Sequence, residues 1–146
     1  MKYVCEIEIN IPVEKVVDFW SDETNFPNWQ DGFISIELLE GNWNVEGSKS
    51  KILFKNGKQK MELIETVISN NLPFSKKALY EHIHMSNTQL SRFEKISDTR
   101  SKIISEVEYT HFNGFMPKMM ATFFTGMFKR QSQKWLDQFK IVVEKS

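Results

Sequence analysis

Cysteine is almost absent from this sequence, with Cys5 as its single instance. One cysteine cannot form an intramolecular disulfide, so a disulfide-stapled secreted scaffold is excluded. The acceptor motif for N-glycosylation, Asn-x-Ser/Thr, is also absent. Both absences suit a reducing compartment, and we expect a cytoplasmic protein.

Long apolar runs are missing as well. The N-terminal stretch MKYVCEIEINIP alternates apolar and charged residues, whereas a signal peptide needs an unbroken apolar segment. No window approaches the roughly 18 apolar residues that a membrane-spanning helix requires. We therefore expect neither a signal peptide nor a transmembrane segment.

Neither sign of charge is in excess, because 19 Lys and Arg residues balance 19 Asp and Glu residues. No overall field attracts the chain to nucleic acid or to an anionic membrane. One local basic cluster can still support peripheral membrane contact or docking on an acidic partner, although lysines on a hairpin also keep strand edges from pairing. The cluster comprises Lys49, Lys51, Lys55, Lys58 and Lys60.

Recognisable catalytic motifs are absent too. The sequence has no Gly-x-Ser-x-Gly elbow, no phosphate-binding glycine loop and no His-Glu-x-x-His motif. Catalysis is therefore not indicated, and no cofactor is expected. His82 and His84 on one predicted strand and His111 on another are the only candidate zinc ligands. No cysteine lies near them, and no metal site is predicted.

At 146 residues the chain fits one domain, residues 1–146. Apolar and polar residues alternate from Tyr3 to Ile11, which predicts a strand with one solvent-facing side. Pro12 then opens a short amphipathic helix that ends near Ser21. The segment TNFPNWQDG that follows reads as a turn-rich connector with an optional helical turn.

Six further strands are predicted, and Asn56-Gly57 is the strongest hairpin signal among their connections. They span about residues 33–40, 49–55, 59–69, 77–85, 88–96 and 101–112. The last thirty residues contain no proline after Pro117 and predict one helix about 45 Å long. Seven antiparallel strands and a long terminal helix define an α+β fold.

The long helix has one broad apolar face when projected at about 100° per residue. We expect this face to pack on the sheet. Its members are Met116, Met120, Phe123, Phe124, Met127, Phe128, Gln131, Trp135, Gln138, Phe139 and Val142. Gln131 is polar in the middle of this face, so a buried amide there would need a partner.

Five segments together resemble the helix-grip superfamily of START domains, polyketide cyclase-like proteins and the birch-pollen-allergen fold, known as SRPBCC proteins. They are INIPVEKVVDFWSD, NFPNWQDGFISIELLEG, MELIETVISNNLP, EVEYTHFNGFMPKMM and KWLDQFKIVVE. The resemblance covers the whole chain. It implies a seven-stranded curved antiparallel sheet that wraps around the C-terminal helix, with short helices between the first two strands. It also implies a cavity between sheet and helix.

Several residues are candidates for lining that cavity. Four of the seven methionines lie in the first part of the long helix, and flexible methionine side chains can repack around different guests. Polar tips from two strands would orient the guest. The predicted ligand-binding residues are Tyr80, His82, Phe93, Tyr109, Met116, Met120, Phe123, Phe124, Met127 and Gln131.

The function that follows is noncovalent binding of a small hydrophobic or amphipathic ligand, such as a lipid-, polyketide- or aromatic-like molecule. One alternative is a cyclase, isomerase or hydrolase that uses the same cavity, with Glu65, Tyr80, Tyr109 and His82 as its polar groups and His82 as acid or base. Another is a protein-interaction module that uses the lysine cluster. A Met- and Phe-rich helix that merely fills a closed core is the purely structural alternative. Either a monomer or a homodimer fits the sequence.

Overall fold

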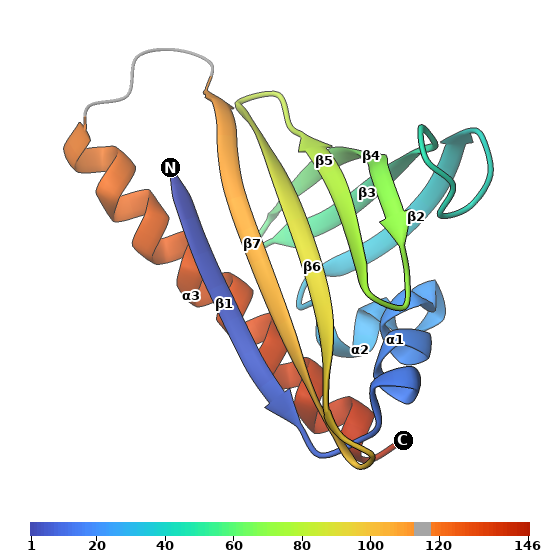
Figure 1. Cartoon of the computed structure of the whole chain (residues 1–146). Helices are drawn as coiled ribbons and strands as arrows, with labels where there is room; N and C mark the ends of the chain where they lie inside the picture. Colours follow the sequence, from blue (N-terminus) through green and yellow to red (C-terminus); the bar gives the residue numbers. More distant parts are fainter. Residues whose placement is uncertain (113–117) are drawn as a thin grey trace.

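The computed structural model of the chain describes residues 1–112 and 118–146, without the side chains of 118–121. Seven antiparallel strands form one curved sheet in the order β1-β7-β6-β5-β4-β3-β2 (Figure 1). They are β1 (Lys2–Ile9), β2 (Phe33–Glu40), β3 (Lys49–Asn56), β4 (Gln59–Asn71), β5 (Ser75–Glu81), β6 (Met85–Ser97) and β7 (Arg100–Phe112). The first two strands are therefore the two edges of the sheet.

Short helices connect β1 to β2, and one long helix forms the C-terminal part of the chain. They are α1 (Val13–Ser21), a 3-10 turn η1 (Glu23–Asn25), α2 (Phe26–Trp29) and α3 (Lys118–Glu144). The predicted fold class is confirmed, including the short helices between the first two strands. None of the helices in the described ranges is long and apolar enough to cross a membrane.

The concave face of the sheet carries the hydrophobic core. Cys5 of β1, Phe93 of β6, Val107 of β7 and Phe139 of α3 are buried members of one hydrophobic cluster. Val16 and Val17 of α1 join the same cluster. The core thus holds α1 and α3 against β1, β7 and β6.

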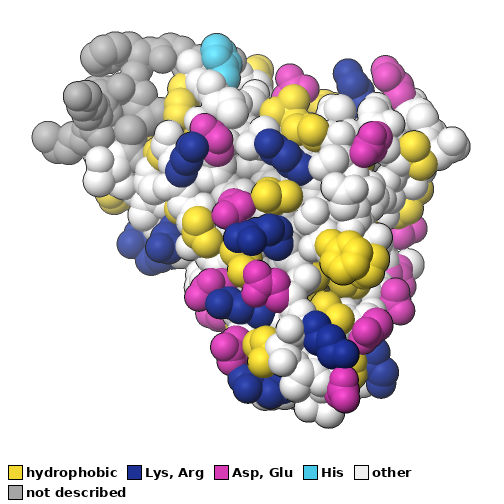
Figure 2. All heavy atoms as spheres, viewed as in Figure 1, with side chains coloured by type: hydrophobic (Ala, Val, Ile, Leu, Met, Phe, Trp, Pro, Cys, Tyr) yellow, Lys and Arg dark blue, Asp and Glu magenta, His cyan; other side chains and the backbone are white. Residues whose placement is uncertain are grey.

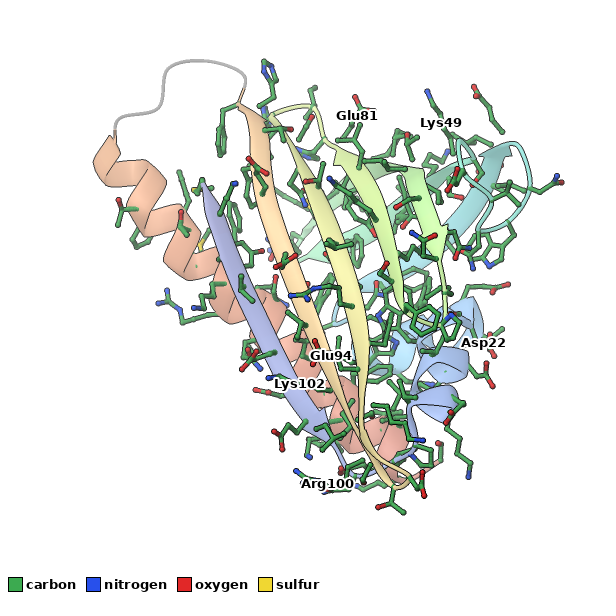
Figure 3. All side chains as sticks on the ribbon, in the orientation of Figure 1. Asp22, Lys49, Glu81, Glu94, Arg100 and Lys102 are labelled. Carbon is green, nitrogen blue, oxygen red and sulfur yellow. The ribbon has the colours of Figure 1, made fainter. Side chains whose placement is uncertain are left out.

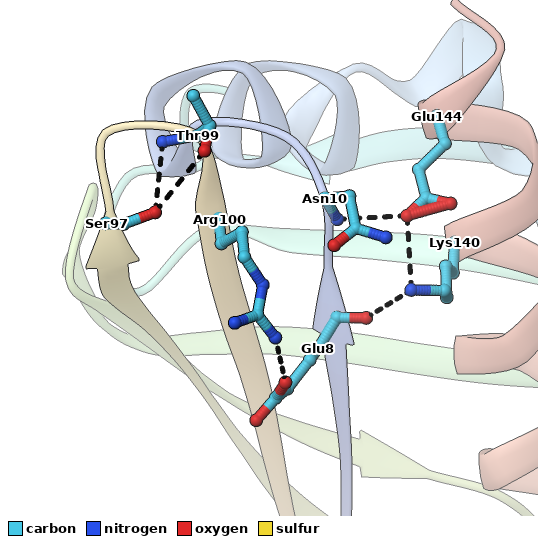
Figure 4. A network of polar contacts seen from close by, with 7 residues as sticks. All are labelled: Glu8, Asn10, Ser97, Thr99, Arg100, Lys140 and Glu144. Atoms are coloured by element: carbon cyan, nitrogen blue, oxygen red, sulfur yellow. Dashed lines mark hydrogen bonds and ion pairs between the residues drawn. The ribbon is translucent and has the colours of Figure 1, made fainter.

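The long helix α3 covers the free edge of β1 (Figure 4). Lys140 Nζ donates to the Glu8 carbonyl at 2.7 Å, and Gln133 Nε2 donates to the Glu6 carbonyl at 3.2 Å. The Asn10 backbone N–H donates to Glu144 Oε1 at 2.9 Å. An unpaired strand edge can pair with another chain, so these bonds protect β1 while they fix the helix beside it.

The opposite, convex face carries charged side chains of both signs, intermixed over β1, β7 and β6 (Figure 2). Lys102 pairs with Glu6 at 3.3 Å, and Arg92 pairs with Glu106 at 3.2 Å. Arg100 also bonds to Glu8 (Figure 4). Figure 3 shows Lys102 and Glu94 on the neighbouring strands β7 and β6. This face is therefore exposed to solvent and carries charges of both signs, so the hydrophobic core lies on the concave face.

Two predicted strand ends are wrong. The strand predicted over residues 77–85 is β5, which ends at Glu81, and residues 82–84 form the turn to β6. The His82 N–H donates to the Met85 carbonyl at 2.8 Å, and His82 Nδ1 accepts from the His84 N–H at 3.2 Å. The prediction places Ser86 and Asn87 in a turn between the strands 77–85 and 88–96, because serine and asparagine are common turn residues, but both residues are in β6. Likewise, β1 ends at Ile9 rather than Ile11.

Candidate functional site

A row of polar side chains crosses the concave face from β3 to β7. Each member lies directly opposite the next on the neighbouring strand, so side chains in the row share a face and stand about 5 Å apart. The members are Ser50, Glu65, Tyr80, Asn87 and Tyr109. We call these five residues the polar row. Its position opposite the helix makes it the candidate site.

Apolar side chains lie on both sides of the polar row. Two residues along each strand, the same face carries Val67, Ala78, Gln89 and Val107 on one side, and the Gln89 amide donates to Ser91 Oγ at 3.3 Å. Ile52 and Leu63 lie on the other side. A guest on this face would therefore meet a band of hydrogen-bonding groups between mainly apolar surfaces.

Glu65 and Tyr80 form the centre of the polar row. The Tyr80 hydroxyl donates to Glu65 Oε2 at 2.7 Å, and Glu65 is only 8% exposed. Burial raises the pKa of Tyr80 well above its ordinary value, and the adjacent Glu65 carboxylate adds to the shift. Part of the Tyr80 side chain is nevertheless accessible to solvent. Tyr80 is therefore surrounded by protein atoms without being fully closed off from solvent.

Lys76 is a buried cation on β5, four residues before Tyr80. Its Nζ donates to Asn44 Oδ1 at 2.7 Å and lies 5.7 Å from the centre of the Trp20 ring. Burial lowers the pKa of Lys76, although the negative charge of Glu65 partly opposes the shift. Lys76 therefore has its own partners, while its charge still acts on Glu65.

Stacked aromatic rings close the β7 end of the polar row against α3. The Phe128 ring stacks on Tyr109 with 5.0 Å between centroids, and Phe124 stacks on Phe128 with 5.9 Å between centroids. Tyr3 joins the stack, and its hydroxyl bonds Ser132 Oγ at 2.8 Å. Burial raises the pKa of Tyr109, with Tyr3 as the second cause. Both phenols are thus neutral at physiological pH.

A second aromatic cluster, beside the β3 end, separates the concave face from a surface cleft. Trp135 stacks on Phe54 with 5.4 Å between centroids, and Trp29 packs edge-on against Phe139 at 5.2 Å. Behind these rings is a cleft of about 300 Å³ between α2 and α3. Its lining comprises Pro27, Asn28, Trp29, Asp31, Gln131, Lys134, Trp135 and Gln138.

The structure brings together only some of the predicted site residues. Tyr80 and Tyr109 belong to the polar row, and Phe124 reaches it through the ring stack. Phe93 lies on the same face but is buried in the core, where its ring packs edge-on against Trp20 at 5.0 Å.

Other predicted lining positions are directed elsewhere. Gln131, on the helix face predicted to pack on the sheet, is instead exposed and lines the cleft between α2 and α3, and its contact with a ligand stays a prediction. Phe123 is 63% exposed and Met127 is 37% exposed, so the helix face predicted to pack on the sheet is only partly correct. Leu136 and Val143, which the projection did not include, are buried because α3 packs on the edge strand as well as on the concave face.

Three predicted residues remain to be placed. His82 lies in the turn after β5, where burial and the neighbouring His84 lower the pKa of His82. Met116 lies outside the described residues, as does the side chain of Met120. Their contact with a ligand stays a prediction.

The described part of the chain holds no cluster of three or more residues suited to bind a metal ion. His82 and His84 are close, with 5.3 Å between ring centroids, whereas His111 lies on β7.

The lysine cluster lies on the β3–β4 hairpin. Lys51 pairs with Glu37 of β2 at 3.7 Å, and Lys55 lies directly opposite Lys60. Peripheral membrane contact through this hairpin stays a prediction.

Sequence reasoning missed Ser50, Asn87 and Lys76 as site residues. Alternation along β3 would have placed Ser50 on the same face as Ile52, but a small hydroxyl between apolar residues drew no attention. Asn87 falls between the predicted strands 77–85 and 88–96, and Lys76 falls just before the first of them. Their roles depend on strand register, which the individual strand patterns do not supply.

Comparison with solved structures agrees with this architecture. Ara h 8.0201 is 16% identical with a TM-score of 0.78, over 100% of this chain and 99% of that chain. A START superfamily protein from Mycobacterium smegmatis is 14% identical with a TM-score of 0.79, over 99% and 97% of the two chains. The Zhui aromatase/cyclase from Streptomyces is 10% identical with a TM-score of 0.80, over 99% and 93%.

No protein-family model and no curated protein sequence matches the chain. At identities this low, structural likeness establishes the fold and not the activity. The resemblance predicted from the sequence motifs is nevertheless confirmed at this level: the chain has the helix-grip fold of the SRPBCC and START-like proteins.

Proposed function

We propose that this protein binds a small hydrophobic or amphipathic molecule, without covalent chemistry, on the concave face between the sheet and α3. The observation that carries the proposal is the environment of Tyr80. Its phenol lies deep enough for burial to raise the pKa, it bonds the buried Glu65, and the residue as a whole is only partly buried. A hollow lined by a few polar groups among apolar side chains is typical of ligand sites.

Affinity in such a site comes from apolar burial. The rows that flank the polar row supply aliphatic side chains, including Val67, Ala78 and Leu63. Burial of apolar surface stabilises a complex by about 25 cal/mol per Å² before the cost of lost motion is subtracted. The polar row would orient the guest, because a polar group of the guest that is buried without a hydrogen-bond partner costs free energy.

The fold of the relatives agrees with this proposal without defining the ligand. One of them is named as an aromatase/cyclase. For this chain, binding is favoured over catalysis by the position of His82, the residue considered as acid or base. It lies in the β5–β6 turn, and its Nδ1 accepts the His84 N–H.

The proposal is tested by filling the hollow. Leu63 points to the concave face and is partly accessible, whereas its neighbour Glu62 points to the exposed convex face of the same strand. Fluorescence titration with Nile red, a neutral apolar dye, would measure binding to the wild type, Leu63→Trp and Glu62→Trp. We expect Leu63→Trp to weaken binding at least tenfold, because the indole occupies space that the dye needs.

Glu62→Trp is the matched control, since it adds the same indole outside the site and should retain wild-type affinity. Thermal unfolding of all three proteins would establish that Leu63→Trp is folded. Equal affinity in the three folded proteins, or no binding of the dye by the wild type, would contradict the proposal.

A further inference from the structure

We infer that the guest presents a hydrogen-bond donor, a hydroxyl or an ammonium group, to Glu65 and Tyr80, and that the site discriminates against carboxylate headgroups. This inference rests on the proposed function, because it concerns the polar end of a guest bound on the same concave face. It follows from which side-chain atoms of the polar row remain available for hydrogen bonds.

The Glu65–Tyr80 pair has spare acceptors and no spare donor. Tyr80 has one hydroxyl proton, which it donates to Glu65 Oε2 at 2.7 Å. The Tyr80 oxygen can still accept a bond, and a carboxylate accepts at both of its oxygens. Among the described residues, Tyr80 is the hydrogen-bond partner of the Glu65 side chain. A guest that meets this pair can therefore satisfy it only by donating.

The neighbours in the polar row do not reverse this preference. Ser50 is opposite Glu65, and Asn87 is opposite Tyr80. A hydroxyl and a primary amide each donate and accept, so both residues can serve either kind of guest. The sign of the selectivity is consequently set by Glu65, the only charged member of the row.

Lys76 is the cation that would attract a carboxylate guest. Its ammonium already donates to Asn44 Oδ1 at 2.7 Å and lies over the Trp20 ring. A carboxylate in the polar row would stand next to the buried Glu65, and two like charges in one buried site disfavour each other's ionisation. An alcohol avoids this repulsion, and an ammonium group gains from the same charge.

A headgroup series with one tail separates this inference from the proposed function. At pH 7, 1-octanol, octylammonium and octanoate would each be titrated against the wild type, with Nile red displacement as the readout. We expect octanol and octylammonium to bind at least tenfold more tightly than octanoate. Octanoate binding as tightly as the other two would overturn the inference while leaving the proposed function intact. Failure of all three to displace the dye would overturn both.

The role of Glu65 is tested with Glu65→Gln and the matched control Glu81→Gln. Glu81 lies at the end of β5 (Figure 3), on the face opposite to Tyr80. Glu65→Gln keeps the shape of the side chain, removes its charge and adds a donor, so the preference for octylammonium over octanoate should fall at least tenfold. Glu81→Gln should retain it. An unchanged preference in Glu65→Gln, or a preference for octanoate that disappears in Lys76→Met, would overturn the inference.

Discussion

The Tyr80 hydroxyl donates to Glu65 Oε2 at 2.7 Å from the directly opposite position on the neighbouring strand. Each residue is therefore held by the sheet itself rather than by a mobile loop. Glu65 is nearly fully buried, so loss of its partner would leave a carboxylate in a poorly solvated place. The pair therefore contributes both to the stability of the sheet and to the polar groups of the candidate site.

Tyr80→Phe should destabilise the protein by about 1–3 kcal/mol, because a buried acceptor loses its donor. Urea unfolding followed by circular dichroism would measure the change in the free energy of unfolding. Adding Glu65→Leu to Tyr80→Phe should recover much of that loss, since an apolar pair leaves nothing unsatisfied. Additive losses in the double variant would contradict this account of the pair.

Removing the ammonium group that caps β1 should loosen the edge of the sheet. Lys140 bonds the Glu8 carbonyl at 2.7 Å and pairs with Glu144 at 3.1 Å. Lys140→Met should cost about 1 kcal/mol and speed amide hydrogen exchange in β1 more than in β4. Lys145→Met, an exposed change one residue beyond α3, is the control and should leave exchange unchanged. Equal protection of β1 in both variants would contradict the capping role.

The bond between Glu144 and Asn10 predicts a defined pH dependence. The Asn10 backbone N–H that donates to Glu144 holds the pKa of this carboxyl below its ordinary value of 4.5. Because the folded pKa is lower than the unfolded one, ionised Glu144 stabilises the folded protein fully above pH 4.5. That contribution is lost as the pH falls through the folded pKa.

Glu144→Gln keeps the accepting oxygen but loses the charge, so it should be less stable than the wild type at pH 7 by about 0.5 kcal/mol. The difference in the free energy of unfolding should shrink below pH 4.5, where the wild-type carboxyl becomes protonated. Denaturant titrations at several pH values between 3 and 7 would measure this difference in the free energy of unfolding. A difference that does not change with pH would exclude this role for Glu144.

Cys5 should be unreactive in the folded protein. Its side chain is 1% exposed, and burial raises the pKa of its thiol, so little thiolate is available. Labelling with a maleimide should follow global unfolding and accelerate at least a hundredfold in denaturant. Fast labelling under native conditions would show that β1 and α3 separate readily at this point.

Much of the fold follows from local patterns in the sequence. Alternation in β1 and β7 placed Cys5 and Val107 on the core face, and Asn56-Gly57 fixed the β3–β4 hairpin. The proline-free C-terminal region indicated one long helix. These patterns work because each depends only on neighbours within one element. The predicted end of β5 is wrong because the His82–His84 turn carries none of the usual turn residues.

The candidate site was less accessible to such reasoning. Tyr80 and Tyr109 were recognised as polar tips on strands, but their membership in one row depends on the register of two strand pairs, β5–β6 and β6–β7. The exposure of Gln131 depends on how α3 rotates against β1, which an ideal helix projection does not contain. Lys76 is a neighbour of the site because Glu65, on the adjacent strand β4, acts on its charge, and no single strand pattern reveals that relationship.

The central claim, a guest bound on the concave face, is tested most directly by isotope-filtered NMR of the labelled protein with unlabelled 1-octanol. Leu63 and Ile64 are adjacent on β4 and point to opposite faces, so their methyl groups form an internal comparison. We predict intermolecular cross-peaks from octanol to the methyl groups of Leu63 and Val67, and none to those of Ile64. Cross-peaks confined to Ile64 and other convex-face side chains, or none at saturating octanol, would contradict the claim.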